Sequence, residues 1–130
     1  MDGKVAAVFE GCSEPARTSL LELRALILKT AVNTGVGPLE ETLKWGQVSY
    51  LTSKSRSGTT IRIDQDSQSG AVALYVHCQT DLVSRYRTLY PEAFRYQGDR
   101  AVLLNDTVDQ AALEHVIALA LTYHWAKTSR

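Results

Sequence analysis

The chain has 130 residues, a length that fits one domain with one ordinary hydrophobic core. Its content of 45% hydrophobic and 22% charged residues is typical of a soluble globular protein. Acidic and basic residues balance at 14 each, so no global field attracts nucleic acid or an anionic membrane, and neither is expected as a partner.

The sequence predicts a cytoplasmic protein. The first ten residues contain only a short apolar run, unlike a signal peptide, and no apolar run has the length of a membrane span. The two cysteines, Cys12 and Cys78, lie far apart and provide no disulfide framework. Both are therefore expected to be reduced thiols.

One domain is predicted over residues 1–130, in which residues 1–12 form a loosely structured lead-in. A helix is then predicted over about residues 14–33. Pro15 suits its first turn, and a glycine in the segment 33–38 suits its end. Its apolar residues recur at helical spacing: Leu20, Leu23, Ile27 and Ala31.

The middle of the chain changes to the period of two that is typical of strands. Apolar and polar residues alternate in runs near 43–50, 61–63 and 72–78. Polar segments 53–58 and 66–70 are predicted hairpin loops. A short helix is predicted over about 80–89, and a hairpin about Gly98 and Asp99 joins residues 94–96 to 101–104.

A final helix is predicted from Thr107 to about Trp125. Thr107 as N-cap and Gln110 three residues later match a capping box. One apolar face follows, formed by Leu113, Val116, Ile117, Ala120 and Leu121. Two long helices that flank antiparallel strands predict an α+β two-layer sandwich, with both helices on one sheet face and the other face at least partly open.

A short motif near the first strand resembles a known family. Glu41, Thr42, Lys44, Trp45 and Gly46 match the E-T-x-K-W-G motif of the YdhG-like domains, a family of unknown function. The likeness continues through segments 61–63, 74–78, 89–91, 94–96 and 121–124, and covers most of the chain from about Leu20. Many members have a proline shortly after the Trp-Gly pair, where this chain has Gln47, Val48 and Ser49. The resemblance implies a frataxin-like sandwich and, as an activity, intracellular iron chaperoning.

The open sheet face is where a binding site is expected. Strand alternation places Lys44, Arg62, Tyr75 and His77 on the face away from the helices. These cationic and aromatic side chains suit a carboxylate or phosphate. The leading hypothesis is a non-enzymatic binding domain for a small anionic ligand or a protein partner. The alternative interpretation is an ordinary solvated sheet face.

No metal site and no cofactor are predicted. Adjacent strand residues point to opposite faces, so His77 and Cys78 cannot easily chelate one ion, and Cys78 is expected to be buried. Iron chaperoning stays as the alternative that the resemblance implies, although the N-terminal carboxylates are interspersed with basic residues and form no acidic ridge. These carboxylates are Glu10, Glu14, Glu22, Glu40 and Glu41.

The sequence predicts no catalytic residue, because it lacks the nucleophile-elbow, Walker A and dinucleotide-binding motifs. A hydrolase or transferase that uses His77 as general base is the third hypothesis. Trp45 is expected to anchor the core, and Trp125 is a candidate contact in a homodimer or with another partner. The segment 54–58 is expected to be a flexible, solvated hairpin tip.

Overall fold

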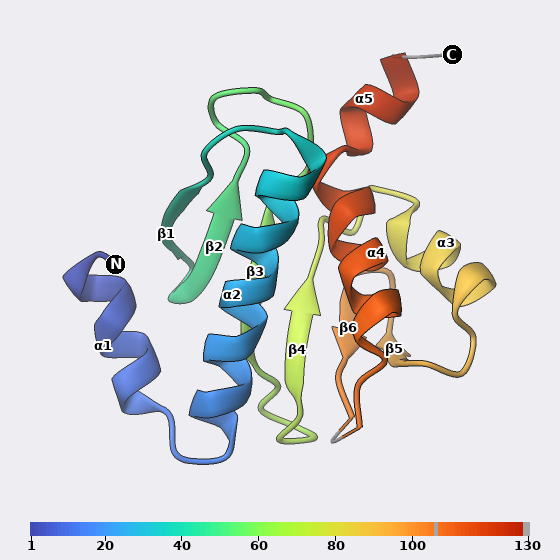
Figure 1. Ribbon diagram of the computed structural model, residues 1–130. Helices are drawn as coiled ribbons and strands as arrows, with labels where there is room; N and C mark the ends of the chain where they lie inside the picture. Colours follow the sequence, from blue (N-terminus) through green and yellow to red (C-terminus); the bar gives the residue numbers. More distant parts are fainter. Residues whose placement is uncertain (106, 129–130) are drawn as a thin grey trace.

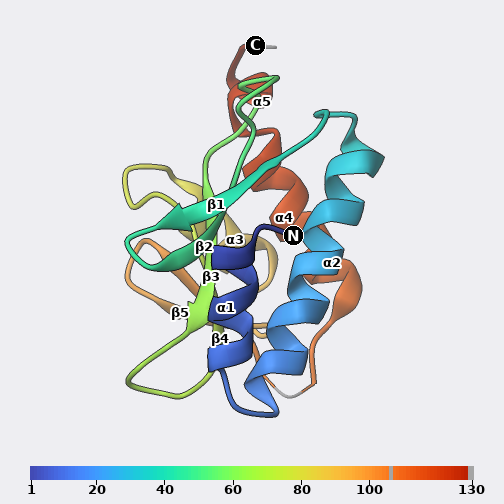
Figure 2. The same cartoon turned by 90° about the vertical axis from the view of Figure 1, so that its left-hand side faces the viewer.

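Two layers make up the protein, with the long helices on one side and the sheet on the other (Figure 1 and Figure 2). The computed structural model describes residues 1–105 and 107–128, with side chains up to residue 125. Within this described part, six strands form one sheet in which every neighbouring pair is antiparallel. The predicted α+β two-layer sandwich, with both long helices on one face, is therefore confirmed.

The helices and strands agree with most of the predicted boundaries. The helices are α1 (Gly3–Gly11), α2 (Ala16–Thr34), α3 (Leu82–Leu89), α4 (Gln110–Leu121) and α5 (Tyr123–Thr128). The strands are β1 (Glu40–Lys44), β2 (Gln47–Leu51), β3 (Ile61–Gln65), β4 (Val72–Tyr75), β5 (Arg95–Gln97) and β6 (Ala101–Leu103). Their order in the sheet is β1-β2-β3-β4-β6-β5, so β5 and β1 form the edges.

One row of side chains, at positions directly opposite one another on neighbouring strands, contributes to the core across the sheet. Leu43, Val48, Ile63, Leu74 and Val102 are directly opposite one another on successive strands. All five pack in the main hydrophobic cluster with α2 and α4. Because successive side chains on a strand alternate between faces, this row fixes which residues face the helices.

Helix α2 lies over the sheet beside α4 because its apolar side chains recur on one stripe. Leu20, Leu23 and Ile27 are at most 2% exposed. The helix ends at Gly35, whose φ of 74° lies in the left-handed region that glycine adopts without strain.

The expectation of a loosely structured lead-in at residues 1–12 is wrong. Residues 3–11 form α1, and the Asp2 carboxylate accepts a hydrogen bond from the Lys4 backbone N–H at 2.7 Å. Val5 and Phe9, one turn apart, are 1% and 3% exposed in the main core. Arg17 donates hydrogen bonds to three carbonyl oxygens at the end of α1 and just beyond it, which ties this helix to the start of α2.

The last helix begins later than the capping-box pattern predicts. Asp109, and not Thr107, is the N-cap, and its Oδ1 accepts a hydrogen bond from the Ala112 N–H at 3.0 Å. The predicted single helix to Trp125 is also interrupted at Thr122, beyond which α5 follows. Asp and Thr are both good N-cap residues, so the sequence offers two candidates two residues apart. The prediction of Thr107 as the N-cap is wrong.

Asp109→Ala should lower the free energy of unfolding by about 1 kcal/mol, because it removes the acceptor for a backbone N–H at the start of α4. The matched control is Thr107→Ala, an exposed position for which we expect a change within about 0.5 kcal/mol. Urea unfolding of both variants gives the comparison. A larger loss for Thr107→Ala would contradict the assignment of the N-cap.

Three polar side chains connect α2 to the first hairpin on the helix side of the sheet. The carboxylate of Glu41 on β1 accepts hydrogen bonds from Arg24 Nε at 2.6 Å and from the Tyr50 hydroxyl at 2.7 Å. Tyr50 is 0% exposed. Burial alone would raise the pKa of Glu41, but the hydrogen bonds from Arg24 and Tyr50 outweigh it and hold the pKa below its ordinary value.

The lowered pKa of Glu41 predicts a stability contribution that is present at neutral pH and lost as the pH falls below about 4.5, the ordinary value of this group. Glu41→Gln should lower the free energy of unfolding by about 1–3 kcal/mol at pH 7, because Arg24 loses its charged acceptor. Urea unfolding at several pH values should show this difference shrinking as the pH falls. A difference that stays constant down to pH 3 would mean that the charge of Glu41 does not stabilise the fold.

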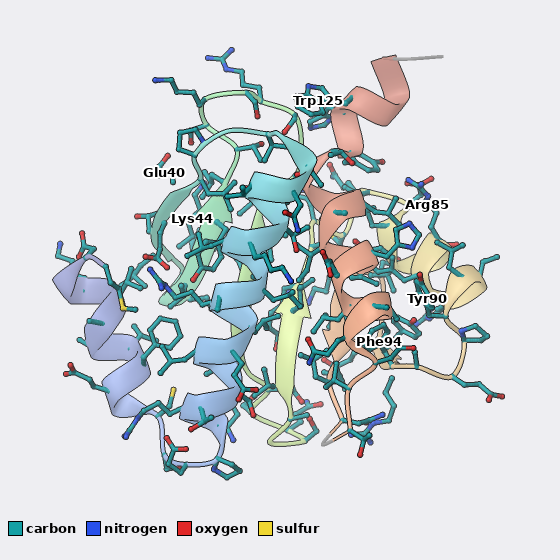
Figure 3. All side chains as sticks on the ribbon, viewed as in Figure 1. Glu40, Lys44, Arg85, Tyr90, Phe94 and Trp125 are labelled. Carbon is teal, nitrogen blue, oxygen red and sulfur yellow. The ribbon has the colours of Figure 1, made fainter. Side chains whose placement is uncertain are left out.

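The segment 54–58 is only partly the solvated hairpin tip expected from its composition, since Lys54 and Arg56 are exposed but Ser57 is not. Ser57 is 0% exposed, and its hydroxyl donates a hydrogen bond to the Leu121 carbonyl oxygen at 2.7 Å. The Ser57 carbonyl oxygen accepts hydrogen bonds from the N–H groups of His124 and Trp125. Figure 3 shows Trp125 beside this loop. The β2–β3 loop therefore satisfies polar groups at the junction of α4 and α5.

Gly58→Ala should destabilise the protein by more than about 2 kcal/mol. A Cβ at this position would lie 2.3 Å from the Ala120 carbonyl oxygen and 2.4 Å from the carbonyl group of Leu121, which are backbone atoms that cannot move aside independently. Gly3→Ala is the control, since nothing lies within 4 Å of its added Cβ. Thermal unfolding that gave the two variants similar midpoints would contradict the close approach.

Candidate functional site: the open sheet face

The face of the sheet away from the helices carries the second register row. Thr42, Ser49, Arg62, Tyr75 and Ala101 lie directly opposite one another across five strands. Each is one residue away from a core position on its strand, so alternation directs it to the opposite face. Arg62 and Tyr75 are direct cross-strand partners on β3 and β4, and two of the predicted site residues are therefore brought together.

A hollow of about 480 Å³ lies on this face between the β1–β2 and β3–β4 hairpins. We call it the open-face hollow. It is lined by Trp45, Gln47, Arg62, Asp64, Gln65, Asp66, Ser67, Tyr75 and Arg100. Most of these side chains are polar, and they come from four separate segments that only the sheet brings together.

Two guanidinium groups contribute the positive charge of the open-face hollow. Arg62 extends from β3, and Arg100 directly precedes β6. The guanidinium carbon of Arg100 lies 5.8 Å from the centre of the Tyr75 ring, within the range of a cation–π contact. Among the residues that the structure describes, neither arginine forms an ion pair with a carboxylate.

The two acidic side chains of the open-face hollow already accept hydrogen bonds from neighbouring residues of the sheet and its turns. Asp64 accepts hydrogen bonds from the Gln47 amide at 3.2 Å and from the Gln65 N–H at 2.8 Å. Asp66 accepts from both the hydroxyl and the N–H of Ser69, and these bonds lower its pKa. The carboxylates thus maintain the hairpins, while the guanidinium groups remain available to a ligand.

Tyr75 forms part of the floor of the face. It is 6% exposed and packs with Ala73, Ala101 and Leu103 in a small apolar cluster separate from the main core. Burial, and then the negative charges of Asp66 and Asp64, raise its pKa, while Arg100 and Arg62 oppose that shift. Its hydroxyl is therefore neutral at physiological pH. The β4–β6 part of the face is less exposed to water than expected.

The prediction that Trp45 anchors the core is wrong, because its side chain is 90% exposed. Trp45 and Gly46 form the two-residue connection between β1 and β2, and both have positive φ, of 57° and 76°. Positive φ at both positions is the pattern of a type I′ turn, which fits the twist of a hairpin. The turn holds the indole at the rim of the open-face hollow.

Lys44 and His77, the other predicted site residues, do not line the open-face hollow. Lys44 ends β1 opposite Gln47, which does line it, so strand alternation places Lys44 on the same face. His77 is exposed but lies beyond the end of β4, in a turn where its Nδ1 accepts a hydrogen bond from the Gln79 N–H at 3.1 Å. The strand alternation from which its position was inferred no longer applies there.

Cys78 lies in the same turn and is exposed, so the prediction of a buried thiol is wrong. Val76, two residues earlier, is 1% exposed in the core as expected. The turn closes with the Thr80 N–H donating to the His77 carbonyl oxygen at 3.1 Å. If β4 extended to residue 78, strand alternation would place Val76, His77 and Cys78 as predicted.

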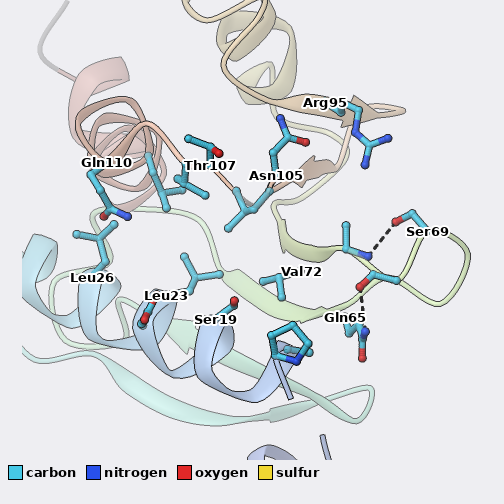
Figure 4. A pocket seen from close by; sticks show the side chains of 18 residues that line it. Ser19, Leu23, Leu26, Gln65, Ser69, Val72, Arg95, Asn105, Thr107 and Gln110 are labelled. Carbon is cyan, nitrogen blue, oxygen red and sulfur yellow. Dashed lines mark hydrogen bonds between the residues drawn. The ribbon is translucent and has the colours of Figure 1, made fainter. Parts of the chain in front are cut away.

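A larger cleft of about 890 Å³ lies at the other side of the sheet, between the N-terminal halves of α2 and α4 (Figure 4). Leu23 and Val72 line one wall, and Asn105 and Thr107 line the opposite one. Among its described lining residues the charged side chains are Glu22 and Arg95, which have opposite signs. This cleft therefore has one cationic side chain, whereas the open-face hollow has two guanidinium groups among its four charged side chains.

Comparison with protein-family models, with curated proteins and with solved structures finds no match to the chain. Among the described residues, no group of three or more His, Cys, Asp or Glu side chains is arranged to hold a metal ion. No helix of the described part is long and apolar enough to cross a membrane.

The structure adds Trp45 and Arg100 to the residues predicted from sequence. Arg100 directly precedes a short strand that pairs with β4 across 26 positions of sequence, and only that long-range pairing brings it to Tyr75. Trp45 had a local signal, since a residue followed by glycine between two alternating runs is typical of a hairpin turn.

Proposed function

We propose that the protein is a binding domain that holds a carboxylate or phosphate group in the open-face hollow, between Arg62 and Arg100. One observation carries this proposal: both guanidinium groups lack an ion-pair partner among the described residues, whereas both neighbouring carboxylates already accept hydrogen bonds, Asp64 from Gln47 on β2 and Asp66 from Ser69. A guanidinium group binds two oxygens of one anion through two parallel hydrogen bonds, which favours a carboxylate or phosphate over a simple halide.

The surroundings of the two arginines suit a ligand that also has an apolar or planar part. Tyr75 forms a rigid floor, and the exposed indole of Trp45 stands at the rim. Tryptophan, tyrosine and arginine are the residues most enriched at energetic centres of protein interfaces. The anion can thus belong to a small molecule or to an acidic side chain of a partner protein, and the same arginines would bind either.

Arg62→Ala and Arg100→Ala should each weaken anion binding by about tenfold to a hundredfold, because each removes a charge-assisted hydrogen bond. Inorganic phosphate and citrate are suitable probes, titrated at constant ionic strength against the melting temperature and by calorimetry. Wild-type protein should show a melting temperature that rises with the concentration of at least one probe. Both variants should fold, since Arg62 is partly exposed and Arg100 exposed.

Lys54→Ala is the matched control, because Lys54 is an exposed cation on the β2–β3 loop that does not line the open-face hollow. It should bind the probes as the wild type does. Equal stabilisation of wild type and Arg62→Ala would show that the anion binds elsewhere. No stabilisation of the wild type by either probe, together with no binding by calorimetry, would contradict a small-anion site.

Iron chaperoning is the alternative that the resemblance to YdhG-like domains implies. It rests on the motif residues at 41–46 and the ordered series that follows them. No described cluster of metal-binding side chains adds to it. Anaerobic titration with ferrous iron separates the two proposals, since Arg62→Ala should leave iron binding unchanged and weaken anion binding.

A further inference from the structure

Helix α2 has a second apolar stripe, on the side away from its core contacts. Leu21, Ala25, Leu28 and Val32 form it; Leu28 also packs against the edge of the main core, and the other three are exposed, which is unusual for a helix already packed on a core. Val32 is 80% exposed and Leu21 37%, while Ala25 is exposed and Leu28 is half-buried. In Figure 2, α2 lies farther from the strands than α1, so its outer side faces solvent.

The spacing of this stripe is that of a coiled-coil seam. The four residues follow one another at intervals of four, three and four, which corresponds to the alternating a and d positions of a heptad repeat. A helix that served only to cover the sheet would need one apolar stripe, the one that contains Leu23 and Ile27. The second stripe is thus arranged to pack against another helix.

We propose that this stripe joins two copies of the chain, with α2 of one copy antiparallel to α2 of the other about a two-fold axis. In the register that uses the whole stripe, Leu21 packs opposite Val32 of the second copy, and Ala25 opposite its Leu28. The two-fold axis then passes between residues 26 and 27. Each of the four layers pairs one a position with one d position, as antiparallel helix pairs require.

The charges beside the stripe favour a second copy and this orientation. Glu22 and Lys29 flank the stripe on one side, and neither forms an ion pair among the described residues. The antiparallel pairing puts Glu22 beside Lys29 of the second copy, and the two-fold axis repeats the contact. A parallel pairing would instead put Lys29 beside Arg24, which has the same charge, and Glu22 beside Arg17, whose guanidinium group is already bound within its own chain.

The opposite flank of the stripe is consistent with the same pairing. Its basic side chains are already held within the chain, because Arg24 is bound by Glu41 and Arg17 by three carbonyl oxygens. They therefore do not compete with Lys29 for Glu22. Four layers of side chains form a small interface, which is typical of weak and reversible association. The expected state is a monomer–dimer equilibrium that depends on protein concentration.

Sedimentation equilibrium of the wild type and three charge variants tests the pairing. Glu22→Lys and Lys29→Glu should each weaken dimerisation about tenfold, because two attractive contacts become repulsive. The double variant Glu22→Lys with Lys29→Glu should restore the dimerisation constant to within about twofold of the wild type. A merely structural role of these residues would not produce that restoration.

Val32→Lys should abolish dimerisation, since it puts a charge into the outer layer of the seam. Leu89→Lys is the matched control, an exposed leucine on α3 that should dimerise as the wild type does. Circular dichroism shows whether each variant is folded. A wild type that stays monomeric at millimolar concentration, or a double charge variant that stays as weak as the single ones, would overturn the proposal. Neither outcome bears on the open-face hollow, which is on the opposite face of the sheet.

Discussion

Burial of one sheet face under α2 and α4 is the constraint on which the rest of the structure depends. Once Leu43, Val48, Ile63, Leu74 and Val102 face these helices, the pleat sends every neighbouring side chain to the other face. A shift of one residue in register would exchange the two sets and put Arg62 in the core. The same packing that stabilises the fold therefore also positions the candidate binding residues.

The long elements of this fold could be predicted from the sequence, because their apolar periodicity extends over three or more turns or several alternating residues. Helix α1 was missed although Val5, Val8, Phe9 and Cys12 recur at helical spacing, because this pattern covers only two turns and contains no capping or turn signal as clear as those of the longer helices. The loop at 54–58 was misjudged for a different reason. Its polar side chains suggested solvent, but the partner of Ser57 is Leu121, 64 residues away, and no local pattern indicates such a contact.

Half of the candidate site followed from strand alternation. Arg62 and Tyr75 share one face as predicted, because both lie inside strands whose register the core sets. His77 and Cys78 lie beyond Tyr75, where β4 ends, and there alternation no longer determines direction. Trp45 lies in a turn, where a large apolar side chain does not reach the core. Predictions of orientation thus held within the strands and failed at their ends.

The backbone at Trp45 has a consequence for the stability of the β1–β2 hairpin. A side chain with a Cβ is unfavourable at a φ of 57°, and asparagine or glycine would suit this turn position better. An exposed tryptophan also gains nothing from burial there. The hairpin is therefore locally less stable at Trp45 than it would be with asparagine or glycine there. Backbone strain of this kind clusters at binding sites, which agrees with the place of Trp45 at the rim of the open-face hollow.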